Sequence, residues 1–316
     1  MIKLYLYPDA PPLMHGFESG GAFSDCFPFC KTGIERWCDV VDNPKRAQLF
    51  FGGSYHDNFR WLLQPGRFDY LTNESAAKHV FDREGDWPNL PVPEWLGACT
   101  FSTVNVPEVE RDRFPLSMSR PTFSRLFVQL ARYEAEEFRP PVGKSFGFRG
   151  QRDPHGFREK VRMAFEASIA GGEYSYTESW NGPTPAQSTI VADFRKLILE
   201  HAFSICPAGA GQTTARFFET CYFGRVPVVI NDMRLFGGEG YDMSFAVHIP
   251  ISAREEDITA VFDELAEMPE SEILDRCKAA KAYFDGPVRE YIKDPTLYFL
   301  KFMKKRGLID AAREEI

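Results

Sequence analysis

The stretch FSICPAGAGQTTARFFETCYFGRVPVVIND, residues 203–232, decides the fold. A short apolar run opens it, a loop with two glycines follows at 207–212, and helical spacing covers 213–223 up to Gly224, a natural helix stop. The run VPVVIN at 226–231 is apolar throughout, as buried strands of parallel sheets are. The stretch therefore predicts a strand–loop–helix–strand unit of an α/β sheet.

The start of this helix has the features of an anion site. Free backbone amides and the positive end of the helix dipole attract anions, and the hydroxyl of Thr213 or Thr214 can cap the helix or bind phosphate. Arg216 lies in the first turn, where a cation opposes the dipole, so a bound anion explains it better than helix stability does. Glu219 follows on the same face and suits ribose hydroxyls. The alternative is a structural turn with an Arg–Glu pair.

Several common cofactor motifs are missing from the sequence. The loop has no Gly-Lys-Ser/Thr, and after Gly209 and Gly211 the later position of a GxGxxG motif is Ala215. A dinucleotide-dependent enzyme is a third hypothesis, but the expected strand at 2–7 is not followed by that motif either. Because no Asp-x-Asp occurs, we predict no metal ion and no cofactor.

Length and composition limit the classes of protein. The 316 residues suggest two domains, and a net charge of -8 argues against a broad nucleic-acid surface. Aromatic content is 15%, with 29 Phe, which core packing explains better than sugar stacking. The seven cysteines lack tight pairing, so we expect reduced buried thiols; a metal site at Cys26, Cys30 and Cys38 is the alternative.

No targeting or membrane-spanning segment is expected. The apolar run at the N-terminus is too short for a signal peptide, and no run reaches about 18 apolar residues. We therefore expect a cytoplasmic location. The basic segment KFMKKRG at 301–307 is a candidate for peripheral contact with an anionic membrane, with a solvated helix face as the alternative.

The rest of the chain alternates strand and helix signals, which predicts an α/β protein. The proline-rich segment 139–143 reads as a linker between two domains. Expected strands lie at 2–7, 48–51, 67–71, 79–81, 144–148 and 174–176, and expected helices at 122–137, 157–168, 188–201, 257–267 and within 287–316.

The order of residues in the opening stretch resembles the motif of the exostosin family of glycosyltransferases. The matching positions are Pro207, Gly209, Thr214, Arg216, Phe217, Glu219, Gly224, Pro227 and Val228. Upstream, 148–165 is similar to the family's segment of a glycine flanked by basic residues before an arginine that opens a helix, here Arg149, Gly150, Arg152 and Arg158. Segments 42–51, 79–87 and 110–115 look like further family elements in the right order.

One departure from the family pattern concerns charge. Relatives often carry a basic residue beside the loop glycine, where this chain has Ala208 and Ala210. This departure shifts the neutralisation of a diphosphate to Arg152 and Arg216.

The resemblance implies a GT-B fold, an α/β architecture of two Rossmann-like domains facing a cleft. Residues 1–141 would form the N-terminal acceptor-binding domain and 142–290 the C-terminal domain that binds the nucleotide sugar. A helical tail, 291–316, would pack back on the N-terminal domain.

The resemblance also implies an inverting, metal-independent transfer of a hexosyl or pentosyl group. The donor would be a nucleoside-diphosphate sugar, expected to be UDP-linked, and the acceptor a hydroxyl of a glycan or lipid-linked saccharide. The expected donor-binding residues are Arg152, Gly209, Thr213, Thr214, Arg216 and Glu219. Asp86 and His79 are the leading candidates for the catalytic base, and His56, Asp57 and Glu74 are alternatives. The competing hypothesis is a catalytically silent, nucleotide- or glycan-binding partner subunit.

Overall fold

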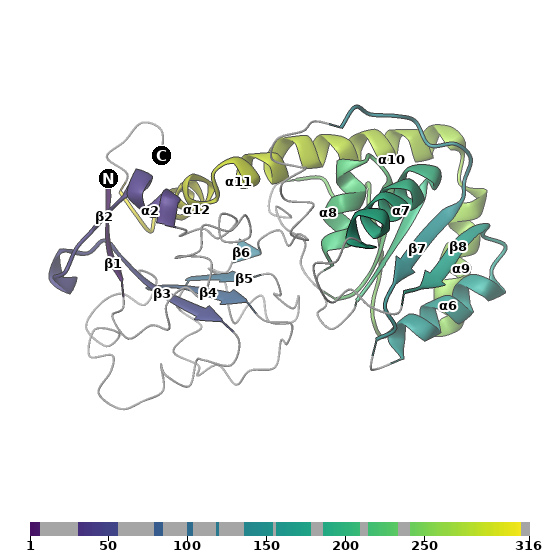
Figure 1. The fold of residues 1–316 in the computed structure, drawn as a ribbon, viewed down its shortest axis with the longest axis horizontal. Coiled ribbons are helices and arrows are strands. Elements are labelled where there is room, and N and C mark those ends of the chain that lie inside the picture. Colours follow the sequence, from purple (N-terminus) through teal and green to yellow (C-terminus); the bar gives the residue numbers. More distant parts are fainter. Residues whose placement is uncertain are drawn as a thin grey trace. The chain divides into compact units, whose positions relative to one another are not determined.

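The computed structural model describes residues 1–6, 31–55, 79–84, 100–103, 118–119, 136–153, 156–177, 186–208, 214–232 and 241–310. The chain forms two compact units, each with its own sheet (Figure 1). The first unit comprises Met1–Tyr133, Arg234–Phe236 and Val288–Ile316, and the second comprises Glu134–Met233 and Gly237–Pro287.

The first unit is built on a six-stranded sheet in which every pair of neighbouring strands is parallel. The strand order is β2-β1-β3-β4-β5-β6. The strands are β1 (Ile2–Leu6), β2 (Cys38–Val40), β3 (Leu49–Tyr55), β4 (His79–Glu84), β5 (Thr100–Thr103) and β6 (Met118–Ser119), and α2 (Lys31–Trp37) and η2 (Pro44–Arg46) lie between the first three.

The C-terminal helices α11 (Arg289–Lys293) and α12 (Pro295–Lys305) belong to this first unit. Helix α12 packs against α2, and the indole Nε1 of Trp37 donates a 2.8 Å hydrogen bond to Oδ2 of Asp294, the N-cap of α12. The close approach requires Gly33, because a Cβ there would lie 1.7 Å from Thr296 Oγ1. The expectation that the C-terminal helix packs back on the N-terminal domain is confirmed.

The second unit contains a five-stranded, fully parallel sheet with the order β11-β10-β9-β7-β8. Its strands are β7 (Phe146–Gly150), β8 (Gly172–Tyr176), β9 (Phe203–Pro207), β10 (Val226–Ile230) and β11 (Val247–Ile249). Its helices are α6 (Phe157–Ala167), α7 (Ala186–Glu200), α8 (Ala215–Tyr222), α9 (Glu255–Glu267) and α10 (Glu270–Tyr283), and the last runs into a kinked segment, η6 (Phe284–Val288).

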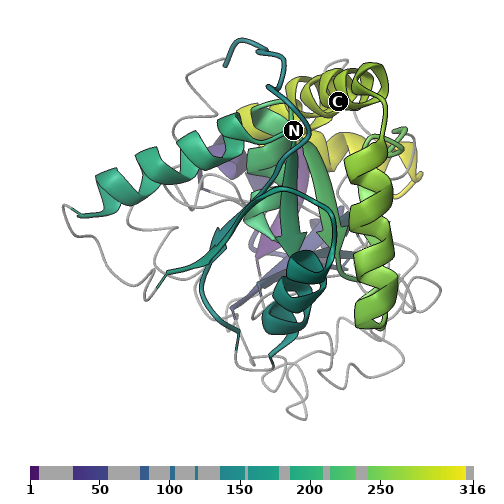
Figure 2. The ribbon, with the colours of Figure 1, turned by 90° about the vertical axis from the view of Figure 1, so that its right-hand side faces the viewer.

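Helices cover both faces of this sheet (Figures 1 and 2). Helices α6 and α9 contact each other on one face, and α7 and α8 contact strands on the other, while α10 contacts α8 and β10. Phe146 stacks on Phe203 with ring centroids 4.5 Å apart, and Phe262 of α9 meets Phe146 edge-on. Burying each such ring contributes about 2–3 kcal/mol, so the phenylalanines described here serve the core, as their number suggested.

The predicted fold class, α/β with two parallel Rossmann-like sheets, is confirmed. Most predicted elements of the second unit fall within a few residues of the observed ones. Strand β11, which has only three residues, and helix α10 were not predicted from the sequence. The predicted strand at 67–71 lies outside the described residues, as does most of the predicted helix at 122–137.

The described cysteines match the expectation of buried thiols. Cys38, Cys206, Cys221 and Cys277 are buried and free, and burial raises the pKa of the Cys206 thiol to about 12. Within the described ranges, no three His, Cys, Asp or Glu side chains gather as a metal site would require. The same part of the chain contains no helix of the length and apolar character needed to cross a bilayer.

Candidate functional site

Strands β7 and β9 separate toward their carboxyl ends. They pair only through Phe146 with Phe203 and Gly147 with Ser204. Beyond these pairs β7 stays with β8 and β9 stays with β10. The chain order also reverses here, since β8 lies on one side of β7 and β9 on the other. In open α/β sheets ligands bind at such a switch point, so a ligand site is expected there.

Two helices begin at this switch point, and their first turns differ in charge. At α6 the carboxylate of Asp153 accepts hydrogen bonds from the backbone amides of Phe157, at 2.9 Å, and Arg158, at 2.7 Å. At α8 the N-cap is the neutral Thr214, whose hydroxyl accepts from the amide of Arg216 at 3.3 Å. The free amides of the first turn of α6 are thus already bound by the Asp153 carboxylate. The first turn of α8 instead carries the cation Arg216 and no acidic residue.

The side chain of Arg216 lies in the split between β7 and β9. Its guanidinium carbon is 4.6 Å from the ring centroids of both Phe148 and Phe194. These rings belong to β7 and α7, which places the guanidinium between the two faces of the sheet. Its Nη2 donates a hydrogen bond to the backbone carbonyl of Arg149. Arg149 belongs to the part of β7 that no longer pairs with β9.

Arg216 is a buried cation. The residue is 8% exposed, and burial lowers its pKa from 12.5 to about 10, which still leaves it protonated at neutral pH. The charge of Glu219, 7% exposed on the same helix, opposes this fall in pKa. Nη1 is buried and has no hydrogen-bond partner among the described residues. A buried charged donor without a partner is costly, so a ligand that accepts from Nη1 would relieve a real penalty.

A second buried arginine, Arg225, provides a contrast. It is 2% exposed, and its Nε also has no acceptor within the described ranges, but its other nitrogens donate to four backbone carbonyls at 2.8–3.0 Å. These carbonyls belong to Arg139, Leu199, Phe223 and Gly224. Arg225 therefore ties the segment before β7 to the ends of α7 and α8, a structural role that Arg216 does not share.

Arg158, in the first turn of α6, connects the two strand ends. Its Nη1 donates to the carbonyl of Gln151, after β7, at 2.7 Å, and its Nε to the carbonyl of Ala208, after β9, at 3.2 Å. Its guanidinium lies 5.8 Å from the Phe148 ring, the same ring that Arg216 contacts. Two guanidinium groups therefore lie at the switch point.

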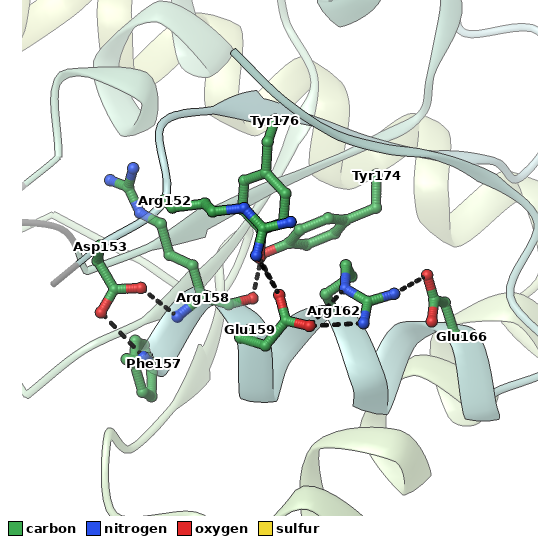
Figure 3. Close-up of polar contacts among 9 residues, drawn as sticks. All are labelled: Arg152, Asp153, Phe157, Arg158, Glu159, Arg162, Glu166, Tyr174 and Tyr176. Atoms are coloured by element: carbon green, nitrogen blue, oxygen red, sulfur yellow. Dashed lines mark hydrogen bonds and ion pairs between the residues drawn. The ribbon is translucent and has the colours of Figure 1, made fainter. Parts of the chain in front are cut away.

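Arg152 occupies a different place (Figure 3). Its guanidinium lies over the Tyr176 ring at 4.5 Å and pairs with Glu159 at 3.6 Å, while the Arg158 side chain extends away from this cluster. The Tyr176 hydroxyl donates to Glu159 at 3.0 Å, and Arg162 donates to the same carboxylate and lowers its pKa. The Arg152 side chain is 73% exposed, so in this structure it is a surface cation held by an aromatic ring.

The neighbouring Arg149 also binds within the β7–β8 edge. Its guanidinium donates to Glu173 at 2.6 Å and to Ser175 at 3.3 Å. Its contribution to the switch point is therefore its backbone carbonyl, which accepts from Arg216.

The predicted donor-binding residues are only partly brought together. Thr214, Arg216 and Glu219 lie at the cap and along α8, whereas Arg152 follows β7 and points to Tyr176. Gly209, Thr213 and Asp86 lie outside the described residues, as do His56, Asp57 and Glu74. His79 is the first residue of β4, where only the backbone is described.

Arg158 was not among the site residues predicted from the sequence. Its only signal was its position as an arginine near the start of a helix after a basic, glycine-containing segment. Its bond to Ala208, fifty residues away in the sequence, could not be read from that position.

Comparison with known proteins leaves the family open. No protein-family model matches the sequence, and no curated protein matches it. Among solved structures, the chain is similar to a mutant of S. aureus TarM in complex with fondaparinux, alpha-GlcNAc-glycerol and UDP, with 8% identity over 72% of this chain and a TM-score of 0.39. A second TarM structure gives 11% identity over 75% of this chain and a TM-score of 0.34. The chain covers 56% of each TarM chain, and such scores assign it neither a family nor an activity.

Proposed function

We propose that this chain is an inverting, metal-independent glycosyltransferase of the GT-B type, related to the exostosin family. It would move a sugar from a nucleoside-diphosphate sugar, with UDP as the expected nucleotide, to a hydroxyl of a saccharide acceptor. The exostosin-like order of residues over 203–232 suggests the class, and the second unit offers a site for the donor.

The observation that carries this proposal is Nη1 of Arg216 at the sheet's switch point, a buried donor for which the described part of the chain provides no acceptor. An anion at the start of α8 would accept from Nη1 and from the amides of the first turn, with Thr214 as the cap. Each charge-assisted bond of this kind contributes about 1.5–3 kcal/mol. The Asp153 carboxylate already serves the first turn of α6, which leaves α8 as the better position for a diphosphate.

The same arrangement suits departure of a nucleoside diphosphate. Negative charge grows on the leaving group as the sugar is transferred, and a preorganised buried cation stabilises that charge without a metal ion. Glu219 is assigned to the ribose hydroxyls of the donor. The acceptor hydroxyl must lose its proton to a base, for which Asp86 and His79 remain the candidates.

A ligand screen followed by turnover assays tests the proposal. Nucleoside diphosphates and their sugars should raise the unfolding temperature of the protein, with the matching nucleobase giving the largest shift. Donor hydrolysis or transfer should persist with EDTA present and should be abolished in Arg216→Ala and Glu219→Ala. Full activity in both variants would remove the donor-site assignment.

A silent partner subunit is the second candidate function. Ala208 stands where relatives often carry a basic residue, and it is only 4% exposed, so a long cationic side chain has no obvious room there. In this case calorimetry would detect UDP binding, no donor would turn over, and a partner protein would restore turnover.

We also propose that the protein is cytoplasmic and contacts anionic membranes through the end of α12, where Lys301, Lys304, Lys305 and Arg306 are exposed. Such a cluster gains about 1 kcal/mol per cation near an anionic surface. Co-sedimentation with phosphatidylserine vesicles but not with neutral vesicles would support the contact. Equal pelleting of a variant with these four residues neutralised would refute it.

A further inference from the structure

We propose that Arg158 is a positioning residue of the donor site. Its guanidinium fixes the carboxyl ends of β7 and β9 relative to each other and thereby sets where the diphosphate lies against Arg216. This inference rests on the proposed function, because it names a residue that the donor site would need.

The backbone geometry creates the need for such a residue. The ladder between β7 and β9 ends at Gly147 and Ser204, so no sheet hydrogen bonds join the strands near Gln151 and Ala208. Arg158 replaces the missing bonds by donating to both carbonyls, at 2.7 and 3.2 Å. A guanidinium suits this task because its donors are fixed in a plane and can be directed to two separate acceptors at once.

Three further contacts hold Arg158 in place. Its backbone amide donates to Asp153, and its backbone carbonyl accepts from the Tyr174 hydroxyl at 2.8 Å (Figure 3). Its guanidinium lies 5.8 Å from the centroid of the Phe148 ring. Burial lowers the pKa of Arg158, as it does for Arg216. The chain therefore keeps two partly or fully buried cations beside one ring, and Arg158 supplies positive charge next to Ala208, where the loop itself has none.

The test compares UDP binding and turnover in variants of the full chain. Arg158→Ala should weaken UDP binding by about 100-fold and lower kcat as well as raising KM, because a misplaced leaving group reacts more slowly. Guanidinium chloride, far below its unfolding range, should restore part of the UDP affinity in this variant and not change that of the wild type.

Lys160→Ala is the matched control. Lys160 lies on the same helix, and its ammonium also donates to two loop carbonyls, those of Ile251 at 3.2 Å and Ala253 at 2.8 Å, but away from the switch point. It should keep wild-type UDP affinity. Arg158→Lys retains the charge without the two-way geometry and should stay well below wild type.

The outcomes separate the two proposals. Wild-type affinity in folded Arg158→Ala, full recovery in Arg158→Lys, or an equal loss in Lys160→Ala would each overturn the positioning role while leaving the proposed function intact. If Arg158→Ala does not fold, the Arg158→Lys result decides alone. A wild-type protein that binds no nucleoside diphosphate would overturn both proposals.

Discussion

Replacing Arg216 with methionine should weaken UDP binding sharply and leave the fold nearly as stable as before. Methionine keeps most of the length of the side chain and removes only the charge and its donors. The fall in pKa from 12.5 to about 10 means that folding is penalised by about 3 kcal/mol for holding this cation in a buried place. Methionine removes that penalty.

The substitution also removes favourable contacts. Each ring contact of the guanidinium, with Phe148 and with Phe194, is worth about 0.5–2 kcal/mol, and the Arg149 carbonyl loses a donor at a cost of about 1 kcal/mol or more. Gains and losses are of similar size. We expect the free energy of unfolding, measured in urea, to change by no more than about 2 kcal/mol.

Binding should respond very differently from stability. Loss of a charge-assisted bond worth about 1.5–3 kcal/mol weakens UDP by about 10- to 150-fold, which calorimetry measures directly. Arg225→Met is the control, because it leaves four backbone carbonyls without their hydrogen-bond donor. It should lower the free energy of unfolding by about 4 kcal/mol and leave UDP affinity unchanged. An Arg216→Met protein that loses 4 kcal/mol or more of stability, or that binds UDP normally, would refute this reasoning.

Three further predictions concern other parts of the second unit. Glu219→Gln should weaken UDP by about tenfold but leave binding of a 2′,3′-dideoxy analogue unchanged, and an equal loss for both ligands in calorimetry would exclude the ribose contact. Gly224→Ala should lower the free energy of unfolding by about 1–3 kcal/mol in urea, because Gly224 has a φ of +62° and a Cβ there would lie 2.7 Å from the Phe138 ring; an unchanged urea midpoint would contradict this. Burial lowers the pKa of His201, so the unfolded chain takes up the proton first and stability falls as the pH drops through about 6.5. His201→Gln should make that decline shallower, and an identical pH profile of the thermal midpoint would count against it.

Local sequence was sufficient for the α/β class and for the element that carries the proposed site. The apolar runs at 203–207 and 226–230 are five-residue strands buried at every position, as is typical of a parallel sheet covered on both faces. Thr214 and Gly224 set the limits of α8, because a hydroxyl cap and a glycine stop act on the nearest turn of backbone. The charge of Arg216 could also be recognised from local sequence, because a cation in the first turn of a helix opposes the helix dipole.

Only the tertiary structure decided how far apart β7 and β9 lie at their carboxyl ends and which side chains bridge them. Register between strands 57 residues apart depends on packing from both faces of the sheet, and no local pattern encodes it. The sequence predicts that Arg152 and Arg216 together neutralise the diphosphate, but in this structure the Arg152 side chain is held by the Tyr176 ring and Glu159. The hydrogen bond from Arg158 to Ala208 joins two strand ends that no longer pair, so it became visible only in the fold. The sequence determined that a cation lies at the start of α8, whereas the fold determined which groups surround that cation.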